Sequence, residues 1–150
     1  MANTYTALHY HIVFSTKDRE PWITPAIENR VWTYLAGIAT QQGMAARTIG
    51  GLDDHIHLVI DIPPTLVLSK AVQLLKGSSS RWIRQTFPDL ETFRWQDGYG
   101  AFTVSVSALP TTVAYVEQQR ITHQKRTFQD EFRALLQRHG IAYDERYLWS

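Results

Sequence analysis

The sequence predicts an α+β domain of the ferredoxin-like type, in which helices cover an antiparallel sheet. Segments with a two-residue hydrophobic period alternate with segments of helical period in the order β-α-β-β-α-β, which is the order of that fold. The first and third predicted strands carry apolar residues at every second position, so each strand can bury one face. A chain of 150 residues is long enough for one hydrophobic core, and we expect one domain over residues 1–150.

The first part of the chain supplies two strands and a helix. A strand is predicted over residues 8–14, where every second residue from Leu8 to Phe14 is apolar and the opposite face carries His9, His11 and Val13. A helix follows, because apolar residues recur at helical spacing between a start at Thr24 and a stop at Gly43. A second, short strand is expected over residues 45–49, and a turn over residues 50–54 leads into the third strand.

The middle of the chain continues the pattern with a third strand, a helix and a fourth strand. The third strand ends at a proline pair, and a second helix is predicted over residues 65–87. Small residues at 77–80 interrupt its helix propensity, which predicts either a kink or the close approach of a backbone or ligand. A fourth strand is expected over residues 101–107.

Two further helices are predicted after the fourth strand. Pro110 opens the first of them, and Thr127 with Asp130 forms a variant of the capping box at the start of the second. Gly140 ends that last helix, and the aromatic tail over residues 141–150 is expected to dock on the domain. The helices between the strands would cover one sheet face and leave the other for a partner, a ligand or a second sheet.

The composition excludes several classes of protein. The chain has no cysteine, which rules out disulfides and thiolate metal sites. It has no apolar run of membrane-spanning length and no secretory leader, so we expect a cytoplasmic protein without a membrane contact. The net charge is only +1, so contacts with a polyanion would have to come from local basic groups that also suit solvated helix faces. Two such groups are Lys76, Arg81 and Arg84, and Arg120, Lys125 and Arg126.

Two histidines share one face of the third predicted strand. His55 and His57 are two residues apart, so they point the same way, while Ile56 points into the core. Two neighbouring imidazoles can hold a divalent metal. His9 and His11 on the first strand have the same spacing, so spacing alone does not choose between the pairs. Because the first and third strands are neighbours in this fold, we expect the two pairs to lie close together.

A metal site and a nucleophile would need further residues. Gln119 and the aspartates at positions 53, 54 and 61 could supply an oxygen ligand. Tyr115 lies four residues before Gln119 in a predicted helix, so the two share a face. Together with a metal, a tyrosine can attack a phosphodiester, although ordinary packing explains a helical tyrosine equally well. The sequence lacks the glycine-rich phosphate loop of an NTPase and the nucleophile elbow of an α/β-hydrolase.

With these motifs, the chain resembles the HUH-type single-tyrosine transposases of small bacterial insertion sequences, which include the REP-associated tyrosine transposases. HUH denotes His, hydrophobic residue, His, and His55-Ile56-His57 matches it. The resemblance extends from about residue 5 to residue 149. It departs from the family at Gln118, where Asn is frequent, and at His123-Gln124, where two histidines are frequent. The other matching segments are residues 11–17, 76–81, 95–105, 115–119 and 127–132.

The resemblance implies an enzyme, a DNA strand-transferase with one metal-dependent site. His55, His57 and Gln119 would bind one divalent cation, Mg²⁺ or Mn²⁺, and Tyr115 would be the nucleophile that forms a 5′-phosphotyrosine link. The substrate would be single-stranded DNA that carries a hairpin, and the protein would be a homodimer with merged sheets. The candidates for contacts with the DNA backbone are Lys76, Arg81, Arg120, Lys125 and Arg126.

Three other functions compete with this one. A non-catalytic module would bind a DNA hairpin with the same fold. A histidine-metal phosphodiesterase would use water as its nucleophile and would form no covalent protein–DNA species. A housekeeping dimer would carry its histidines incidentally.

Overall fold

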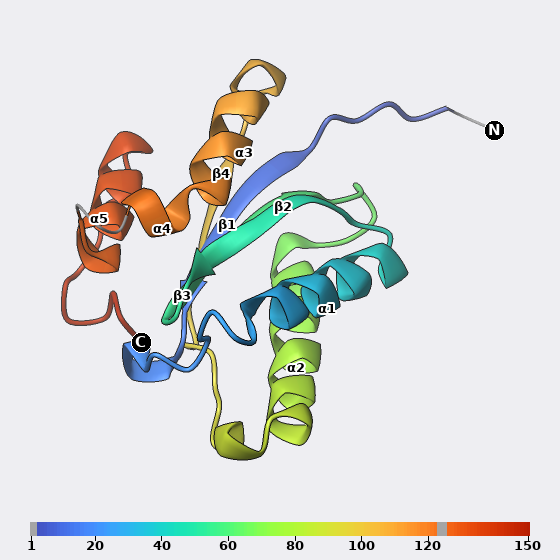
Figure 1. Ribbon diagram of the computed structural model, residues 1–150. Coiled ribbons are helices and arrows are strands. Elements are labelled where there is room, and N and C mark those ends of the chain that lie inside the picture. Colours follow the sequence, from blue (N-terminus) through green and yellow to red (C-terminus); the bar gives the residue numbers. More distant parts are fainter. Residues whose placement is uncertain (1–2, 123–125) are drawn as a thin grey trace.

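The computed structural model describes residues 3–122 and 126–150, and its centre is a four-stranded sheet (Figure 1). The strands lie in the order β2-β3-β1-β4, and each neighbouring pair is antiparallel. This arrangement confirms the predicted ferredoxin-like class, in which the first and third strands are neighbours. The strands are β1 (His9–Ser15), β2 (Ala45–Leu52), β3 (His55–Asp61) and β4 (Gly100–Thr103).

Helices lie on both faces of the sheet (Figure 1). As expected, α1 (Glu28–Gln41) and α2 (Leu68–Thr86) cover one face. The other face, which the sequence left for a partner, a ligand or a second sheet, is covered by the C-terminal helices of the same chain. These are α3 (Leu109–Glu117), α4 (Gln119–Thr122) and α5 (Phe128–Arg138). Within the described residues, three short 3-10 helices lie in the connections: η1 (Lys17–Arg19), η2 (Pro88–Leu90) and η3 (Val106–Ala108).

The alternation along β1 and β3 separates a hydrophobic core from a polar cluster. In the register of these strands, His11 lies opposite Val59 and Val13 lies opposite His57, so the histidines share one face. The opposite face packs against α1 and α2 in the larger hydrophobic core. Its fully buried strand residues are Ile12, Phe14, Ile56, Leu58 and Ile60.

Two boundaries in the first half differ from the sequence prediction. α1 begins at Glu28 rather than directly after Thr24, because the Thr24 carbonyl accepts from the amides of residues 27 and 28 in a preceding turn. β2 extends to Leu52, so the predicted turn over residues 50–54 shrinks to two residues. The reason is that Gly50 is a strand residue over which a helix backbone passes, at a position where a side chain would clash.

The small residues in the middle of α2 do not kink it. The helix is continuous from Leu68 to Thr86, and Ser79 is buried where its hydroxyl accepts a hydrogen bond from Trp95 Nε1 at 2.9 Å. A small side chain at this position therefore admits the indole. β4 is shorter than predicted and ends at Thr103, because Ser105 instead caps η3 by accepting from the Ala108 amide.

The third predicted helix is interrupted, whereas the last one follows its capping pattern. α3 ends at Glu117, and Gln118 has a non-helical backbone (φ −103°, ψ 23°) before α4 begins at Gln119. The sequence predicted one regular helix that carries both Tyr115 and Gln119. The break at Gln118 instead places them on two helices. At α5, the Thr127 side chain accepts from the Asp130 amide, as expected from the capping box.

The C-terminal tail docks on the domain, in agreement with the prediction. Tyr143, Leu148 and Trp149 pack against a second hydrophobic cluster between α5, β1 and β4. The carbonyl oxygen of Ser150 accepts hydrogen bonds from the Gly98 amide and from Gln96 Nε2. In the described ranges, no helix combines the length and the apolar character needed to cross a membrane.

Candidate active site

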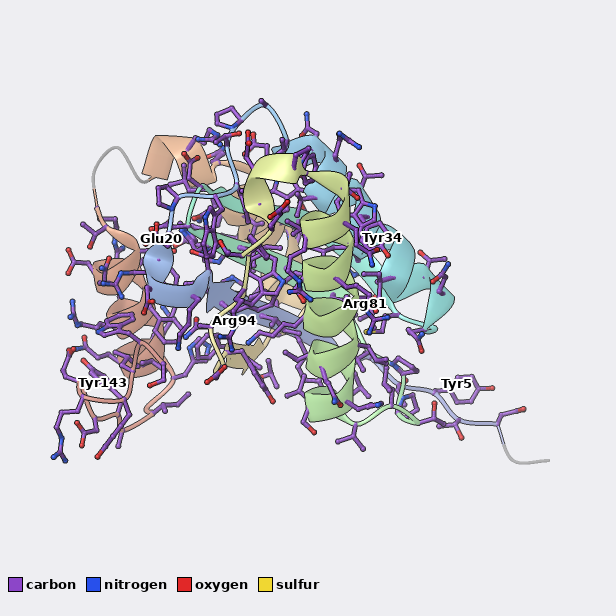
Figure 2. All side chains as sticks on the ribbon, turned by 90° about the horizontal axis from the view of Figure 1, so that it is seen from below. Tyr5, Glu20, Tyr34, Arg81, Arg94 and Tyr143 are labelled. Atoms are coloured by element: carbon purple, nitrogen blue, oxygen red, sulfur yellow. The ribbon has the colours of Figure 1, made fainter. Side chains whose placement is uncertain are left out.

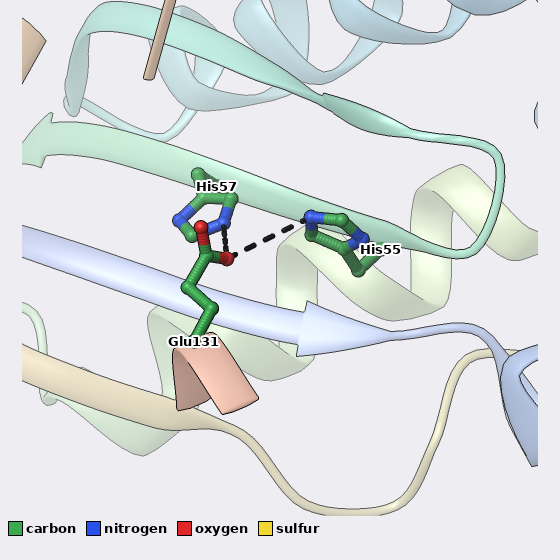
Figure 3. A group of neighbouring side chains, drawn as sticks. All are labelled: His55, His57 and Glu131. Atoms are coloured by element: carbon green, nitrogen blue, oxygen red, sulfur yellow. Dashed lines mark hydrogen bonds and ion pairs between the residues drawn. The ribbon is translucent and has the colours of Figure 1, made fainter. Parts of the chain in front are cut away.

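β3 presents His55 and His57 to the face that the C-terminal helices cover, and both side chains are fully buried. Glu131 of α5 reaches toward the two imidazoles (Figure 3). One ligand atom from each of these three residues lies within 4.8 Å of the others, which is a suitable spacing for one metal ion. The structure thus joins the predicted histidine pair to a carboxylate that the sequence analysis did not identify.

The imidazole rings of His55 and His57 both turn their Nε2 atom toward Glu131. His57 Nε2 lies 2.8 Å from Glu131 Oε1, while its Nδ1 lies 2.7 Å from His11 Nε2. His55 Nε2 lies 3.8 Å from the same carboxylate oxygen, while its Nδ1 lies 2.8 Å from Asp54 Oδ1. Metal-binding histidines commonly engage their second ring nitrogen in this way, which fixes the ring and its tautomer. The two Nε2 atoms are therefore oriented as a pair of ligands would be.

Tyr115 and Gln119 complete the cluster from α3 and α4. The Tyr115 hydroxyl donates a hydrogen bond to Glu131 Oε2, and Gln119 Nε2 lies 3.3 Å from the same oxygen. The amide oxygen of Gln119 lies 3.1 Å from His55 Nε2. The four residues singled out in the sequence are thus brought to one place, despite the helix break between positions 115 and 119.

Two of the groups have perturbed protonation equilibria. Burial, together with the hydrogen bond to Glu131, raises the pKa of the Tyr115 phenol above its usual range. Burial and the neighbouring His57 lower the pKa of His11 to about 3. In the resting state the phenol is therefore protonated, and His11 is a neutral imidazole.

The remaining sequence candidates for a metal ligand lie in other interactions. His9 Nδ1 lies 2.6 Å from Asp61 Oδ1, and Asp61 also forms an ion pair with Arg47. Asp53 faces Arg120 at 3.4 Å. The two histidines of the first strand therefore separate: His9 forms a peripheral hydrogen bond with Asp61, whereas His11 lies against the site.

A cavity opens beside the candidate nucleophile. It has a volume of about 570 Å³ and lies between the end of β4, α3 and α5. Tyr115, Glu131 and His11 contribute to its wall, together with the hydroxyls of Thr103 and Thr112. Two arginine side chains, Arg126 and Arg138, add positive charge to this wall, and the imidazole of His139 also lines it. A phosphodiester strand could reach the Tyr115 hydroxyl through this opening.

The predicted DNA-binding residues are scattered. Arg126 lines the cavity, and Lys125 lies outside the described residues. Arg120 forms an ion pair with Glu28 at 2.6 Å. Lys76 and Arg81 belong to α2, which packs on the opposite face of the sheet from α5 (Figure 1). Figure 2 labels Arg81 on this helix. Lys76 Nζ donates to the carbonyls of residues 96–98, and burial lowers its pKa to about 8.

Glu131 carried a signal that the sequence analysis did not use. It lies three residues after Phe128 and four before Leu135, so it falls in the apolar stripe of α5. Its side chain is only 1% exposed. A charged residue in such a stripe indicates a buried polar partner, but nothing local reveals that the partner lies 74 residues earlier.

A scan against protein-family models finds one family, described as IS200-like transposases, over residues 4–119. Among curated proteins, the chain is 27% identical over 117 residues to the ISDra2 transposase TnpA of Deinococcus radiodurans. That match covers 75% of this chain and 84% of the relative. The chain is also 30% identical over 109 residues to the transposase for insertion sequence element IS200 of Salmonella typhimurium. This match covers 69% of this chain and 72% of the relative.

Two solved structures share the fold. One is a crystal structure, from D. radiodurans R1, of a protein assigned as a transposase, with a TM-score of 0.65 and 27% identity. It covers 79% of this chain and 96% of that one. The other is the REP-associated tyrosine transposase bound to a REP hairpin, with a TM-score of 0.60 over 82% of this chain and 74% of that one. At 11% identity, the second likeness concerns the fold alone.

Proposed function

The chain belongs to the IS200-like transposase family, and on this basis we propose that it cuts and rejoins hairpin-bearing single-stranded DNA through a phosphotyrosine intermediate. The observation that carries the proposal is the convergence of Tyr115, Gln119 and the histidine pair on one buried point. This arrangement places a hydroxyl nucleophile beside a set of metal-ligating atoms. The proposal assigns the activity to one domain over residues 1–150.

The reaction assigned to Tyr115 exchanges one phosphoester bond for another. The phenolic oxygen forms a bond to the scissile phosphorus as the bond from phosphorus to the 3′-oxygen breaks. The products are a 5′-phosphotyrosine and a strand with a free 3′-hydroxyl, and the proton lost by the phenol balances the proton gained by the 3′-oxygen. Attack by another 3′-hydroxyl reverses the step and joins strands without an external energy source.

The donor atoms around the site fit a divalent cation. We propose that His55, His57 and Gln119 hold Mg²⁺ or Mn²⁺, since two imidazole nitrogens and an amide oxygen face one point. When bound, the cation would polarise the scissile phosphate and stabilise the charge on the departing oxygen. The contacts of Asp54 and His11 with the outer ring nitrogens support this role, because they hold both imidazoles in the required orientation.

The proposed partners are a DNA strand and a second copy of the chain. The cavity beside Tyr115, with Arg126 on its wall, is the proposed entrance for the strand. We propose a hairpin as the substrate, as the family resemblance implies; a solved structure of the same fold is bound to a REP hairpin. We further propose a homodimer that acts in the cytoplasm, as the family resemblance implies.

A denaturing gel with end-labelled single-stranded DNA tests the proposal. The DNA carries the hairpins that flank the gene, and Mn²⁺ or Mg²⁺ is added. We expect a metal-dependent band that resists denaturation, and we expect Tyr115→Phe to reduce this band on the order of a thousandfold or more. Tyr147→Phe is the matched control, because Tyr147 is 68% exposed and belongs to the tail.

Two results would overturn the assignment. Cleavage by Tyr115→Phe, with no covalent band in the wild type, would indicate a phosphodiesterase that uses water. Hairpin binding without cleavage, with either metal and several hairpins, would indicate a non-catalytic binding module.

A further inference from the structure

Glu131 lies beyond the residues that the family model matches, yet it lies at the centre of the candidate site. The family match ends at residue 119, whereas Glu131 belongs to α5, which follows that boundary. Its side chain is 1% exposed and therefore removed from water. A buried carboxylate is costly unless other groups stabilise its charge, so the surroundings of Glu131 bear on its role.

The two carboxylate oxygens of Glu131 face different groups. Oε1 faces the histidines, at 2.8 Å from His57 Nε2 and 3.8 Å from His55 Nε2 (Figure 3). Oε2 faces the other side, where it accepts a hydrogen bond from the Tyr115 hydroxyl and lies 3.3 Å from Gln119 Nε2. One carboxylate thus connects the metal-ligating atoms with the candidate nucleophile.

The spacing of the donor atoms suits coordination to one ion. Ligands that surround Mg²⁺ at about 2.1 Å in octahedral geometry lie about 3 Å from their neighbours. Around His55 Nε2, the nearest donors lie at 3.1 Å (Gln119 Oε1) and 3.8 Å (Glu131 Oε1), and the distance from His57 Nε2 to Glu131 Oε1 is 2.8 Å. Three of the distances among these four atoms, which come from three separate chain segments, are therefore within about 1 Å of that spacing.

We propose that Glu131 is a fourth protein ligand of the divalent cation, and that its second oxygen positions the Tyr115 hydroxyl beside that cation. The inference rests on the metal site of the proposed function and adds a carboxylate to its two imidazoles and one amide. An anionic oxygen ligand increases the affinity for hard cations such as Mg²⁺ and Mn²⁺. The same ligand makes α5 part of the active site.

Calorimetric titration of Mn²⁺ into the full chain, without DNA, tests the ligand role. We expect Glu131→Gln to weaken Mn²⁺ binding at least about tenfold, as loss of a metal-site residue does. Asp130→Asn is the matched control: it removes one carboxylate from the same helix, at a side chain that is 63% exposed, and should leave the affinity within about twofold. Wild-type affinity in a folded Glu131→Gln chain would overturn the proposal.

A crystal of the wild-type chain with Mn²⁺ provides a second test that does not depend on how the variant folds. We expect the anomalous density of Mn²⁺ to lie within about 2.4 Å of a Glu131 oxygen. Density beside His55 and His57 with Glu131 turned away would mean that the carboxylate only fills the site before the ion binds, and would overturn the proposal.

The titration also separates this inference from the proposed function. If His57→Ala abolishes Mn²⁺ binding and Glu131→Gln leaves it intact, the inference fails while the two-histidine site stands. If Glu131→Gln weakens binding and Tyr115→Phe still forms the covalent band, the ligand role of Glu131 stands while the assigned nucleophile is wrong.

Discussion

At the scale of single residues, His11 shows how a neutral buried imidazole can orient a neighbouring one. It is 4% exposed, and its Nε2 lies 2.7 Å from His57 Nδ1. Since burial and His57 lower the pKa of His11 to about 3, it stays uncharged throughout the physiological range. A neutral His11 can accept a hydrogen bond from His57 Nδ1, and this contact holds the His57 ring with its Nε2 toward Glu131.

The lowered pKa predicts a loss of stability in acid. In the unfolded chain His11 titrates near 6.5, so between about pH 6.5 and pH 3 the unfolded state binds one more proton than the folded state. The free energy of unfolding should therefore fall with falling pH, at up to about 1.4 kcal/mol per pH unit from this group. Urea denaturation from pH 7 to pH 4.5, with a chelator present, should show a smaller slope for His11→Gln. Equal slopes for the two chains would contradict the prediction.

Part of the site follows from local patterns in the sequence, and the rest depends on contacts between distant segments. The placement of His55 and His57 on one face follows from strand periodicity, which is a local property. The pairing of the first and third strands also predicted that His11 would approach His57. The role of Glu131 depends instead on which helix meets the sheet, and its contact with His57 spans 74 positions. No local pattern encodes such a distance.

At the scale of elements, the close approach of α3 to β2 positions the candidate nucleophile. Gly50 of β2 lies under the end of α3, where an added Cβ would meet the Val116 carbonyl oxygen at 2.5 Å. Tyr115 is the residue before Val116, so the height of this helix over the sheet sets the position of the phenol. The sequence predicted a turn at Gly50 because glycine is common in turns, whereas here it provides space for a helix.

We predict that Gly50→Ala disturbs both stability and strand cleavage. A Cβ at this position must push the α3 backbone away, which should destabilise the chain by about 1–3 kcal/mol and reduce formation of the covalent band. Gly37→Ala is the matched control, since Gly37 is exposed in α1 with nothing within 4 Å of an added Cβ. That change should stabilise the helix by up to about 1 kcal/mol. Thermal unfolding of both variants checks the prediction, which fails if Gly50→Ala unfolds at the wild-type temperature.

At the scale of the whole molecule, hydrophobic packing is divided between the two faces of the sheet. The larger cluster joins the sheet to α1 and α2, and its existence could be predicted from the alternation in β1 and β3. A smaller cluster holds α5 to β1 and β4, with Val13, Phe102 and Phe132 among its members. The sequence predicted that the tail docks, but not that α5 covers the histidine face, because hydrophobic periodicity does not specify which surface a helix meets.

Because a smaller hydrophobic cluster holds α5 than holds α1 and α2, we predict that α5 separates from the sheet more readily than the larger core unfolds. Trp149 packs near Phe128 and Phe132, and Arg133 lies over its ring at 5.2 Å. We expect Trp149→Ala to accelerate hydrogen exchange of the α5 amides by at least about tenfold while the β3 amides keep their wild-type rates. Tyr147→Ala serves as the control, because that side chain is 68% exposed. Equal acceleration in α5 and β3 would show that the two faces unfold as one unit.

The dispersal of the site along the chain has a consequence for biosynthesis. A nascent chain that has left the ribosome as far as α4 already holds the histidine pair, Tyr115 and Gln119. It still lacks Glu131, and also Phe128, whose ring stacks on His55 at 4.5 Å. Because domains generally fold as units during synthesis, the α5 segment has to emerge before the site can assemble. Under the proposed ligand set, translation itself would delay strand cutting until α5 has emerged, so that truncated products carry the nucleophile but not the complete centre.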